Sequence, residues 1–266
     1  MNFKKGVGAF FSIAVKELKV QARYPINMVA WFLYLLIFGA MLVTAGMMFS
    51  GTSDLKMMQI PLCGLIFLTF LESSLWDVGQ SLNWERYGGT LESLYLTPVN
   101  RFISIIARSV LSLTIGVGIT TICLSIICYL HPVPAHRLAI ALGILALNVM
   151  MFSGLGCVMA GICLLLKDTA NLVVNIIWFA CMIFCALFFS FSALPAPILW
   201  VSRAIPLSYG VDAFRSVLLD SAPELLPLPL EILIVAGSSI GMPILGFLIY
   251  RATERVVKIR GGLRTY

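Results

Sequence analysis

The chain has 266 residues, of which 60% are apolar and 11% are charged, and its mean hydropathy is +1.00. A water-soluble fold cannot bury so many apolar side chains, so most of the surface must contact lipid. The composition therefore excludes an ordinary soluble domain and predicts an all-α, polytopic membrane protein. The net charge of +6 does not indicate nucleic-acid binding, because Lys and Arg lie at the ends of apolar blocks.

Residues 1–24 alternate basic and apolar side chains. This pattern predicts an amphipathic helix in the headgroup plane, with its lysines toward anionic lipid. A frayed basic tail is the alternative. The N-terminus lacks the small-residue cleavage site of a secretory signal peptide, so we expect the first span to be retained.

Six apolar blocks follow, each long enough to cross a hydrocarbon core of about 30 Å, which takes about 20 helical residues. The predicted spans within a single membrane domain, 1–266, are residues 26–49, 58–80, 99–130, 138–166, 169–193 and 230–250. If the N-terminus is cytoplasmic, fourteen Lys and Arg residues fall on the cytoplasmic side and four on the other. Because positive charge marks the cytoplasmic side, we expect both termini, including the tail 251–266, in the cytoplasm.

The polar stretch Trp84–Arg101 separates the second and third blocks. Its residues predict a short helix between two chain breaks. Thr90 suits the N-cap of that helix, and Glu92 suits the positive end of its dipole. Pro98 disfavours helix at Thr97 and can occupy the first position of a second helix that Thr97 caps. One apolar face is formed by Leu91, Leu94 and Tyr95. A well-capped loop between two spans would show the same pattern.

The same stretch also resembles a specific motif. It reads Glu-Arg-x-x-Gly-Thr-Leu-Glu-x-Leu-x-x-Thr-Pro-Val-x-Arg, with Gly88 as a second glycine before the threonine and Asn100 at a variable position. This is similar to the loop between spans two and three of permeases of the prokaryotic type-2 ABC exporter class. In that family the loop is the coupling helix, which contacts a separate ATPase subunit. The resemblance implies an ATPase-coupling role for Glu85, Arg86, Gly89, Thr90, Leu91, Glu92, Leu94, Thr97, Pro98 and Arg101.

Residues 194–229 are too rich in proline for a span and too apolar for a free loop. Irregular backbone at membrane depth is tolerated only where protein buries it or where it lines a cavity. We therefore expect residues 194–220 to form half-helices that enter the outer leaflet and return. The family carries Pro-x-[Thr/Ser]-Tyr…Asp…Arg between spans five and six, and this segment resembles it. The resemblance implies gate residues at Pro206, Tyr209, Asp212 and Arg215; a surface pair of helices without a gating role is the alternative.

Ionisable side chains inside apolar spans are rare and therefore informative. Glu72 and Asp77 lie in the second block, and Arg108 lies in the third. At about 1.5 Å per helical residue, Glu72 and Arg108 reach similar depths on antiparallel neighbours, so we expect them to pair. Such a pair is either a hinge or gate near the inner mouth or a neutral contact that fixes helix register.

The fifth block is crowded with aromatic side chains, including Phe179, and carries Asn171 and Asn175 near its inner end. In the resembled family, spans two and five of two subunits line the translocation path. The resemblance therefore implies path residues at Asn171, Asn175 and Phe179, suited to an amphipathic or lipid-linked cargo. An aromatic belt that faces lipid explains the outer aromatic residues equally well.

Small side chains mark places where helices approach closely. They predict such contacts at Gly154 and Gly156 in the fourth block and at the GxxxG pair Gly237 and Gly241 in the sixth. The seven cysteines all lie inside apolar blocks without CxxC spacing. We expect them to be small buried side chains rather than metal ligands.

The sequence contains no P-loop, no nucleophile elbow and no zinc-ligand spacing, so we do not expect this chain to be an enzyme. The resemblance implies a homodimeric or paralogue-paired permease of an ATP-driven exporter in the cell membrane. It implies no cofactor on this chain, because ATP and Mg²⁺ would bind the partner ATPase. The cargo stays open among drugs, lipids, lipid-linked glycans and peptides.

Two other functions compete with this one. An ion- or proton-coupled carrier would use Glu72 and Asp77, but no pair of broken spans repeats across two halves of the chain. A passive membrane anchor explains the hydrophobicity but not the capped polar helix.

Overall fold

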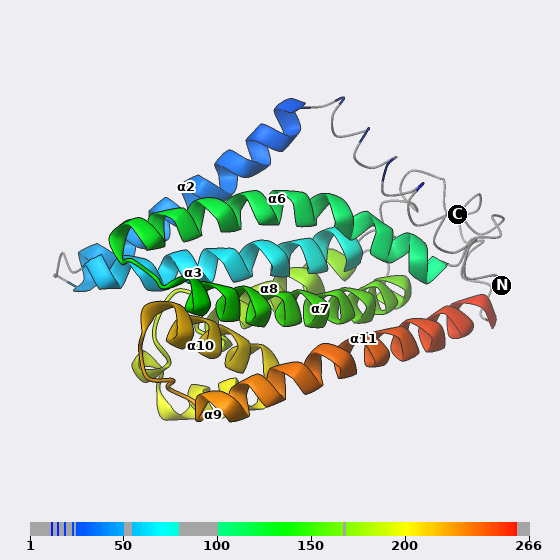
Figure 1. The fold of residues 1–266 in the computed structure, drawn as a ribbon. Helices are drawn as coiled ribbons and strands as arrows, with labels where there is room; N and C mark the ends of the chain where they lie inside the picture. Colours follow the sequence, from blue (N-terminus) through cyan, green and yellow to red (C-terminus); the bar gives the residue numbers. More distant parts are fainter. Residues whose placement is uncertain are drawn as a thin grey trace.

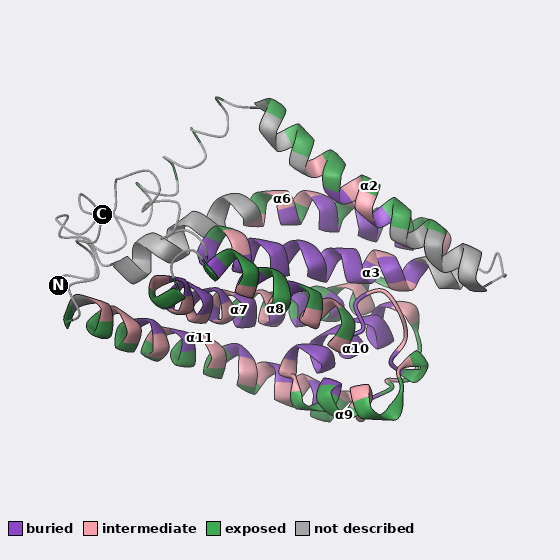
Figure 2. Ribbon diagram, turned by 180° about the vertical axis from the view of Figure 1, so that it is seen from behind, coloured by how far each residue is buried: buried purple, intermediate pink, exposed green. Residues whose placement is uncertain are grey.

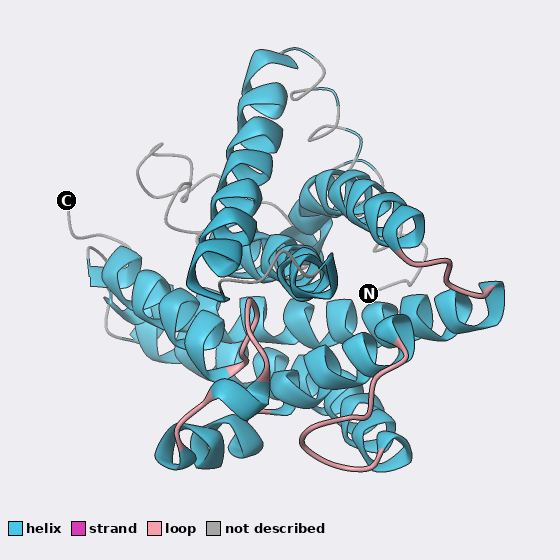
Figure 3. Cartoon of the chain, turned by 90° about the vertical axis from the view of Figure 1, so that its left-hand side faces the viewer, coloured by secondary structure: helices cyan, strands magenta, loops and turns pink. Residues whose placement is uncertain are grey.

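The computed structural model describes residues 12, 15, 19, 23, 25–50, 55–79, 101–166 and 169–259. All secondary structure in these residues is helical, and they contain no strand (Figure 1 and Figure 3). The elements are α2 (Pro25–Ser50), α3 (Leu55–Glu72), η1 (Ser73–Gly79), α6 (Arg101–Leu130), α7 (Ala135–Leu166), α8 (Ala170–Phe184), η3 (Phe191–Ala193), α9 (Ala196–Ala204), α10 (Pro206–Leu219) and α11 (Leu228–Ile259).

The long helices form a bundle in which successive members run in opposite directions (Figure 1). Helix α7 lies at its centre and packs against α11, α10 and η1, while α3 packs against α6 and α2. Figure 2 shows α3 enclosed by its neighbours, whereas α11 has a largely exposed outward side. Helix α2 diverges from the bundle toward its N-terminal end, where Ile26 and Val29 are exposed.

Within the residues that the structure describes, four helical stretches are long and apolar enough to cross a membrane: Gln59–Gly79, Leu113–Leu130, Ala135–Leu166 and Leu228–Val257. In α2 and α8, the apolar stretches Phe32–Met41 and Ala170–Phe184 are shorter. The chain is therefore a multi-pass membrane protein by the length and composition of its helices. The count of six spans stays a prediction for α2 and α8.

The N-terminal and C-terminal ends are described only in part. Of the expected interfacial helix at 1–24, Ser12, Val15, Lys19 and Arg23 are helical and exposed, and the remainder lies outside the described residues. The sixth predicted span ended at residue 250, but α11 continues to Ile259. The expected tail therefore begins as a helical extension, because Arg251–Ile259 keeps a helix-forming sequence without Gly or Pro.

The fifth predicted span, 169–193, differs from the structure. Helix α8 ends at Phe184, and Cys185–Phe188 form a turn in which Ala186 has a positive φ of 47°. Helix α8 has 15 residues, so it is only about 22 Å long at 1.5 Å per residue. The apolar run 184–191 looks helical in sequence, but its carbonyl groups bind a side chain of another helix, as described below.

The second span contains a feature that the sequence pattern did not predict. After Glu72 the helix changes from α to π geometry over Ser73–Gly79. The hydroxyl of Ser74 donates a hydrogen bond to the Phe152 carbonyl of α7. A Cβ at Gly156 of α7 would lie 2.7 Å from the Ser74 carbonyl oxygen, so α7 and η1 touch through backbone. The π turn and this close packing coincide.

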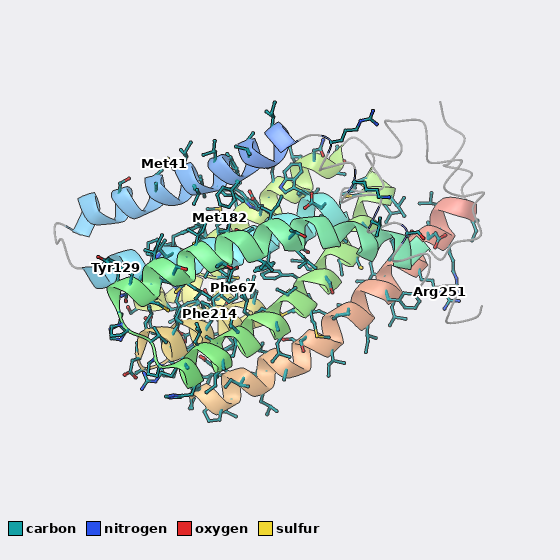
Figure 4. The ribbon with its side chains drawn as sticks, turned by 45° about the horizontal axis from the view of Figure 1, so that its top comes forward. Met41, Phe67, Tyr129, Met182, Phe214 and Arg251 are labelled. Atoms are coloured by element: carbon teal, nitrogen blue, oxygen red, sulfur yellow. The ribbon has the colours of Figure 1, made fainter. Side chains whose placement is uncertain are left out.

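Aromatic and glycine contacts bring distant parts of the chain together. Phe67 of α3 and Phe214 of α10 meet edge to face in the middle of the bundle, with ring centroids 5.3 Å apart (Figure 4). Helix α11 approaches α7 at Gly154, where an added Cβ would lie 2.3 Å from the Met242 carbonyl carbon. Among the described residues of this one chain, Gly237 and Gly241 make no such contact, since a Cβ at either position would meet nothing within 4 Å.

Gly64 of α3 provides a test of this packing. A Cβ there would lie 1.6 Å from the Leu187 carbonyl oxygen, which belongs to the turn after α8. We expect Gly64→Ala to destabilise the fold by about 1–3 kcal/mol, because backbone must move. Gly143→Ala is the control, since a Cβ there meets nothing within 4 Å. Thermal unfolding in detergent measures both, and an unchanged Tm for Gly64→Ala would contradict this packing.

Candidate functional site

The chain breaks inside the bundle after α8. Ala186 and Leu187 are fully buried, although they lie in a turn and not in a regular helix. Some backbone groups of the turn bond to the last residues of α8: the Leu187 N–H donates to the Met182 carbonyl at 3.2 Å. The outward carbonyls of a broken helix need other donors, because an unsatisfied peptide group at membrane depth costs several kcal/mol.

Arg215 of α10 supplies those donors. Its guanidinium group donates to the carbonyl oxygens of Ala186 at 2.7 Å, Leu187 at 2.5 Å and Phe189 at 2.9 Å. The side chain is only 6% exposed. Charge-assisted hydrogen bonds of this kind are stronger than those between neutral groups. A single side chain therefore holds the broken end of α8 against α10.

Asp212, one turn earlier on α10, holds the segment on the other side. One of its oxygens accepts the backbone N–H of Glu224 at 2.7 Å and of Leu225 at 2.8 Å. Both N–H groups belong to the α10–α11 loop, residues 220–227. Asp212 therefore fixes this loop on α10 as Arg215 fixes the turn after α8.

Glu224 joins the two anchored segments directly. Its carboxylate accepts the Ser192 backbone N–H at 2.6 Å and also the Ser190 hydroxyl. Glu231, fully buried in the first turn of α11, accepts the Leu226 N–H at 3.1 Å. We call three segments together the clamp: residues 185–193, which include the turn after α8 and η3, helix α10, and the loop 220–227. Arg215, Asp212 and Glu224 are its main hydrogen-bonding side chains.

Helix α10 is the buried centre of the clamp. Pro206 opens it at the first helical position, and residues 207–218 are all buried. The hydroxyl of Tyr209 donates to the Arg203 carbonyl at 2.6 Å, which ties α9 to α10. A Cβ at Gly210 would lie 2.0 Å from the Asn148 side-chain oxygen of α7, so this glycine lets α10 approach the middle of the bundle.

The four candidate gate residues thus belong to one structural unit. Tyr209, Asp212 and Arg215 bond backbone groups of three different segments, and Pro206 begins the helix that carries them. They do not project from a surface pair of helices. Their part in gating stays a prediction.

An ion pair links the C-terminal end of α10 to α7. Asp220, the left-handed C-cap residue with a φ of 55°, lies 2.5 Å from the Arg137 guanidinium of α7. The hydrogen bond from Arg137 lowers the pKa of Asp220, and His131 acts weakly in the same direction. Both partners are partly exposed to solvent, so the pair links α7 to α10 at the surface.

Glu72 is the last residue of α3, and Asp77 lies within the π segment that follows it. Glu72 is 8% exposed, whereas Asp77 is exposed. The backbone of Arg108 belongs to α6, but its side chain lies outside the described residues. The predicted pair of Glu72 with Arg108 therefore stays a prediction.

The path candidates of α8 share one outward face. Asn171, Asn175 and Phe179 follow each other at intervals of four residues and are all exposed, Phe179 to 55%. The Asn175 amide donates to the Asn171 carbonyl at 2.9 Å. The same side of α8 carries the exposed apolar residues Leu172, Ile176 and Ile183.

Most of the expected ATPase-coupling residues are not described by the structure. The coupling candidates from Glu85 to Pro98 lie outside the described residues, and Arg101 is described only as the first residue of α6. The seven cysteines are free; five are buried and two are half-buried. In the part of the chain that the structure describes, no three His, Cys, Asp or Glu side chains gather in a way that could hold a metal ion.

Sequence reasoning missed Glu224, Glu231, Ser190 and Ser192. Glu231 carried a signal, since it is the acidic residue in the first turn of an apolar helix. Glu224 carried none, because its partners lie more than thirty residues away at Ser190 and Ser192.

Comparison with known protein families finds a match over most of the chain. The family described as ABC-2 type transporter matches residues 8–219, which is most of the chain and ends at the last residue of α10. A search of curated proteins gives no match.

Arg215 offers the first test of the clamp. Arg215→Lys keeps the charge but cannot reach three carbonyl groups in diverging directions. Leaving one or two buried carbonyls unsatisfied costs about 1–3 kcal/mol each, so we expect a marked drop in Tm and faster hydrogen exchange at 185–191. The control is Arg251→Lys, at an exposed position on α11. Equal stability of the two variants would show that the bonds to α8 contribute little.

The Arg137–Asp220 pair offers a test by pH. Asp220→Asn suits the left-handed C-cap and removes only the charge. Because the pKa of Asp220 is lower in the folded state, the pair stabilises the fold above the unfolded pKa of about 3.9. This contribution is lost as the pH falls through the lower, folded value. We therefore expect a small Tm difference from wild type at neutral pH that disappears in acid; a difference that persists in acid would have another cause.

Proposed function

The chain belongs to the ABC-2 type transporter family and is therefore a membrane subunit of an ABC transporter; on this premise we propose that it is the permease of an ATP-driven exporter. Its ATPase would be a separate polypeptide that docks on residues 84–101. The family match over residues 8–219 carries this proposal, because it includes the docking motif and, of the clamp, residues 185–193 and α10.

Helix α6 is the element that would carry force from the ATPase. It begins at Arg101, directly after the docking motif, and continues for 30 residues. This length corresponds to about 45 Å, so one unbroken helix reaches from the docking end to the opposite end of the bundle. Its contacts with α3 and η1 would pass a displacement to the second span.

The clamp would then move as one body. Its three segments are bonded to one another by Arg215, Asp212 and Glu224, so a displacement of one segment would move the other two with it. We propose that the outward opening forms beside the clamp and not through it. The π segment at Ser73–Gly79, which packs on α7, is a place where the second span can change its helical register.

Two copies of the chain would complete the transporter, each with six spans and with both termini in the cytoplasm. The exposed side of α8 supports this arrangement. It presents Asn175 and Phe179 together, a polar and an aromatic side chain on one outward face. A path between two subunits would accommodate both, and such a lining suits an amphipathic or lipid-linked cargo.

Docking is tested with the tagged full-length chain purified in detergent. We expect a polypeptide with a P-loop to copurify in stoichiometric amount and to hydrolyse ATP. Glu92→Gln should reduce its recovery about tenfold or more, since charge-assisted contacts at interfaces contribute about 2 kcal/mol or more. Asp220→Asn is the control, because it removes one negative charge at the clamp end of the bundle.

The outcome separates the candidate functions. A correctly inserted chain that purifies alone and ignores nucleotide would contradict the exporter. The next residues to test would then be Glu72 and Asp77, as parts of an ion-coupled carrier.

A further inference from the structure

Helix α9 has an unusual distribution of polar and apolar residues. Its inward side carries Ser202, which is fully buried and donates to the Ile198 carbonyl at 3.1 Å. Its outward side carries Trp200, 72% exposed, and Val201, 42% exposed. The remaining exposed residues of α9 are Ala196, Pro197, Arg203 and Ala204. Apart from Arg203, the outward face is therefore apolar.

Such a face is not suited to water. An amphipathic helix on a soluble surface turns its polar residues outward, whereas α9 turns its serine inward and its tryptophan outward. The outward face of α9 is therefore expected to lie in an apolar phase.

Helix α9 lies at the end of the bundle where exposed aromatic side chains indicate a membrane interface. It lies at the end of the bundle where α6 ends and where α7 and α11 begin (Figure 1). At that end Tyr129 of α6 is 89% exposed, and Figure 4 places it opposite Arg251 along the bundle. Exposed Trp and Tyr side chains concentrate where the hydrocarbon core meets the headgroups.

The length of α11 between the α9 end and the opposite end of the bundle can be compared with the thickness of a bilayer. There, Arg251 lies over the Phe247 ring, 6.0 Å from its centroid. From Leu228 to Phe247, α11 rises about 28 Å at 1.5 Å per residue, close to the hydrocarbon thickness of about 30 Å. Helix α9 lies beside the first residues of α11 (Figure 1), so the length of α11 from the end near α9 to Phe247 matches the thickness of one hydrocarbon core.

Arg203 gives the outward face of α9 a preference for a phosphate group. Its guanidinium lies 5.9 Å from the Trp200 ring centroid, and its carbonyl is fixed by Tyr209. Within the described part of the chain Arg203 makes no ion pair, whereas Arg137 at the same end is paired with Asp220. An arginine at the rim of an apolar face extends its charge toward the headgroups and can bind a phosphate group in a bidentate way.

We propose that the outward face of α9 binds the lipid of the adjacent leaflet, with Trp200 at the hydrocarbon boundary and Arg203 on the phosphate of an anionic headgroup. This surface needs only a chain that spans a membrane. It does not depend on the direction of transport, on ATPase docking or on which side is cytoplasmic. Its role is to hold α9 at a fixed depth, and with it α10 of the clamp, to which Tyr209 bonds α9.

Fluorescence of the full-length chain in phosphatidylglycerol vesicles tests the depth of Trp200. The contribution of Trp200 is the difference between wild type and Trp200→Phe, an exposed position that folding does not depend on. We expect lipids brominated near the headgroup end of their acyl chains to quench most of this difference signal, and aqueous iodide to quench little of it. Quenching by iodide and not by brominated lipid would overturn the proposal.

Lipid preference tests Arg203. The binding of short-chain phosphatidylglycerol to the detergent-solubilised chain is measured through its effect on Tm, with phosphatidylcholine for comparison. We expect Arg203→Gln to weaken phosphatidylglycerol binding about fivefold, the effect of one arginine near an anionic surface, and Arg203→Lys to weaken it less.

Arg137→Gln is the matched control, since it removes the same charge at the same end of the bundle from an arginine that is already paired. If Arg203→Gln and Arg137→Gln weakened phosphatidylglycerol binding equally, the effect would come from net charge alone, and the proposal would be overturned. Equal stabilisation by inorganic phosphate alone would identify a free-anion site, and would overturn it as well.

Discussion

The fold depends on hydrogen bonds to the backbone carbonyl groups that are left without helical partners where α8 ends inside the bundle. Helix α8 ends at Phe184, and the carbonyls that follow it have no helical partners. Arg215 binds three of them, and neighbouring Asp212 and Glu224 bind the backbone of the adjoining segments. In a membrane, water is not available to replace these donors and acceptors. The polar side chains of α10 and of its following loop therefore make a short, interrupted helix possible at this depth.

The same arrangement explains why α10 is buried although its sequence is more polar than that of the spans. Arg215 and Asp212 are 6% and 4% exposed, and each faces backbone groups that it bonds. Small residues allow the required approach: Gly210 lies against Asn148 of α7, and Gly64 of α3 lies against the turn after α8. The charged side chains of α10 can reach the backbone groups that they bond only because α10 packs closely between α3, α7 and the turn after α8.

Much of this architecture follows from the sequence, and the remainder depends on contacts between distant residues. Apolar blocks located most of the long helices, and the proline-rich segment after residue 194, expected to form half-helices, contains the short helices α9 and α10. Their entry into the outer leaflet stays a prediction. The early end of α8 was not foreseen, because the run 184–191 is as apolar as a span. Its termination depends on Arg215, which is 26 to 29 residues away along the chain.

The π segment and Glu224 escaped prediction for the same reason. The π geometry of Ser73–Gly79 accompanies packing on Gly156 of α7, and Glu224 bonds Ser190 and Ser192 across the clamp. Neither contact leaves a periodic pattern in sequence. Arg215 and Asp212, by contrast, were found through a motif, which identified the residues but not their partners.

The central claim is that the clamp moves as one body during transport. Its most direct test is a disulfide between Ser190→Cys and Glu224→Cys, two positions whose side chains are hydrogen-bonded, in a background without the native cysteines. ATP turnover by the assembled transporter in vesicles would be measured before and after oxidation. The account predicts unchanged turnover, because the bond joins two parts of the same unit. A loss of turnover that reductant reverses would show that the clamp itself must open, and would contradict the account.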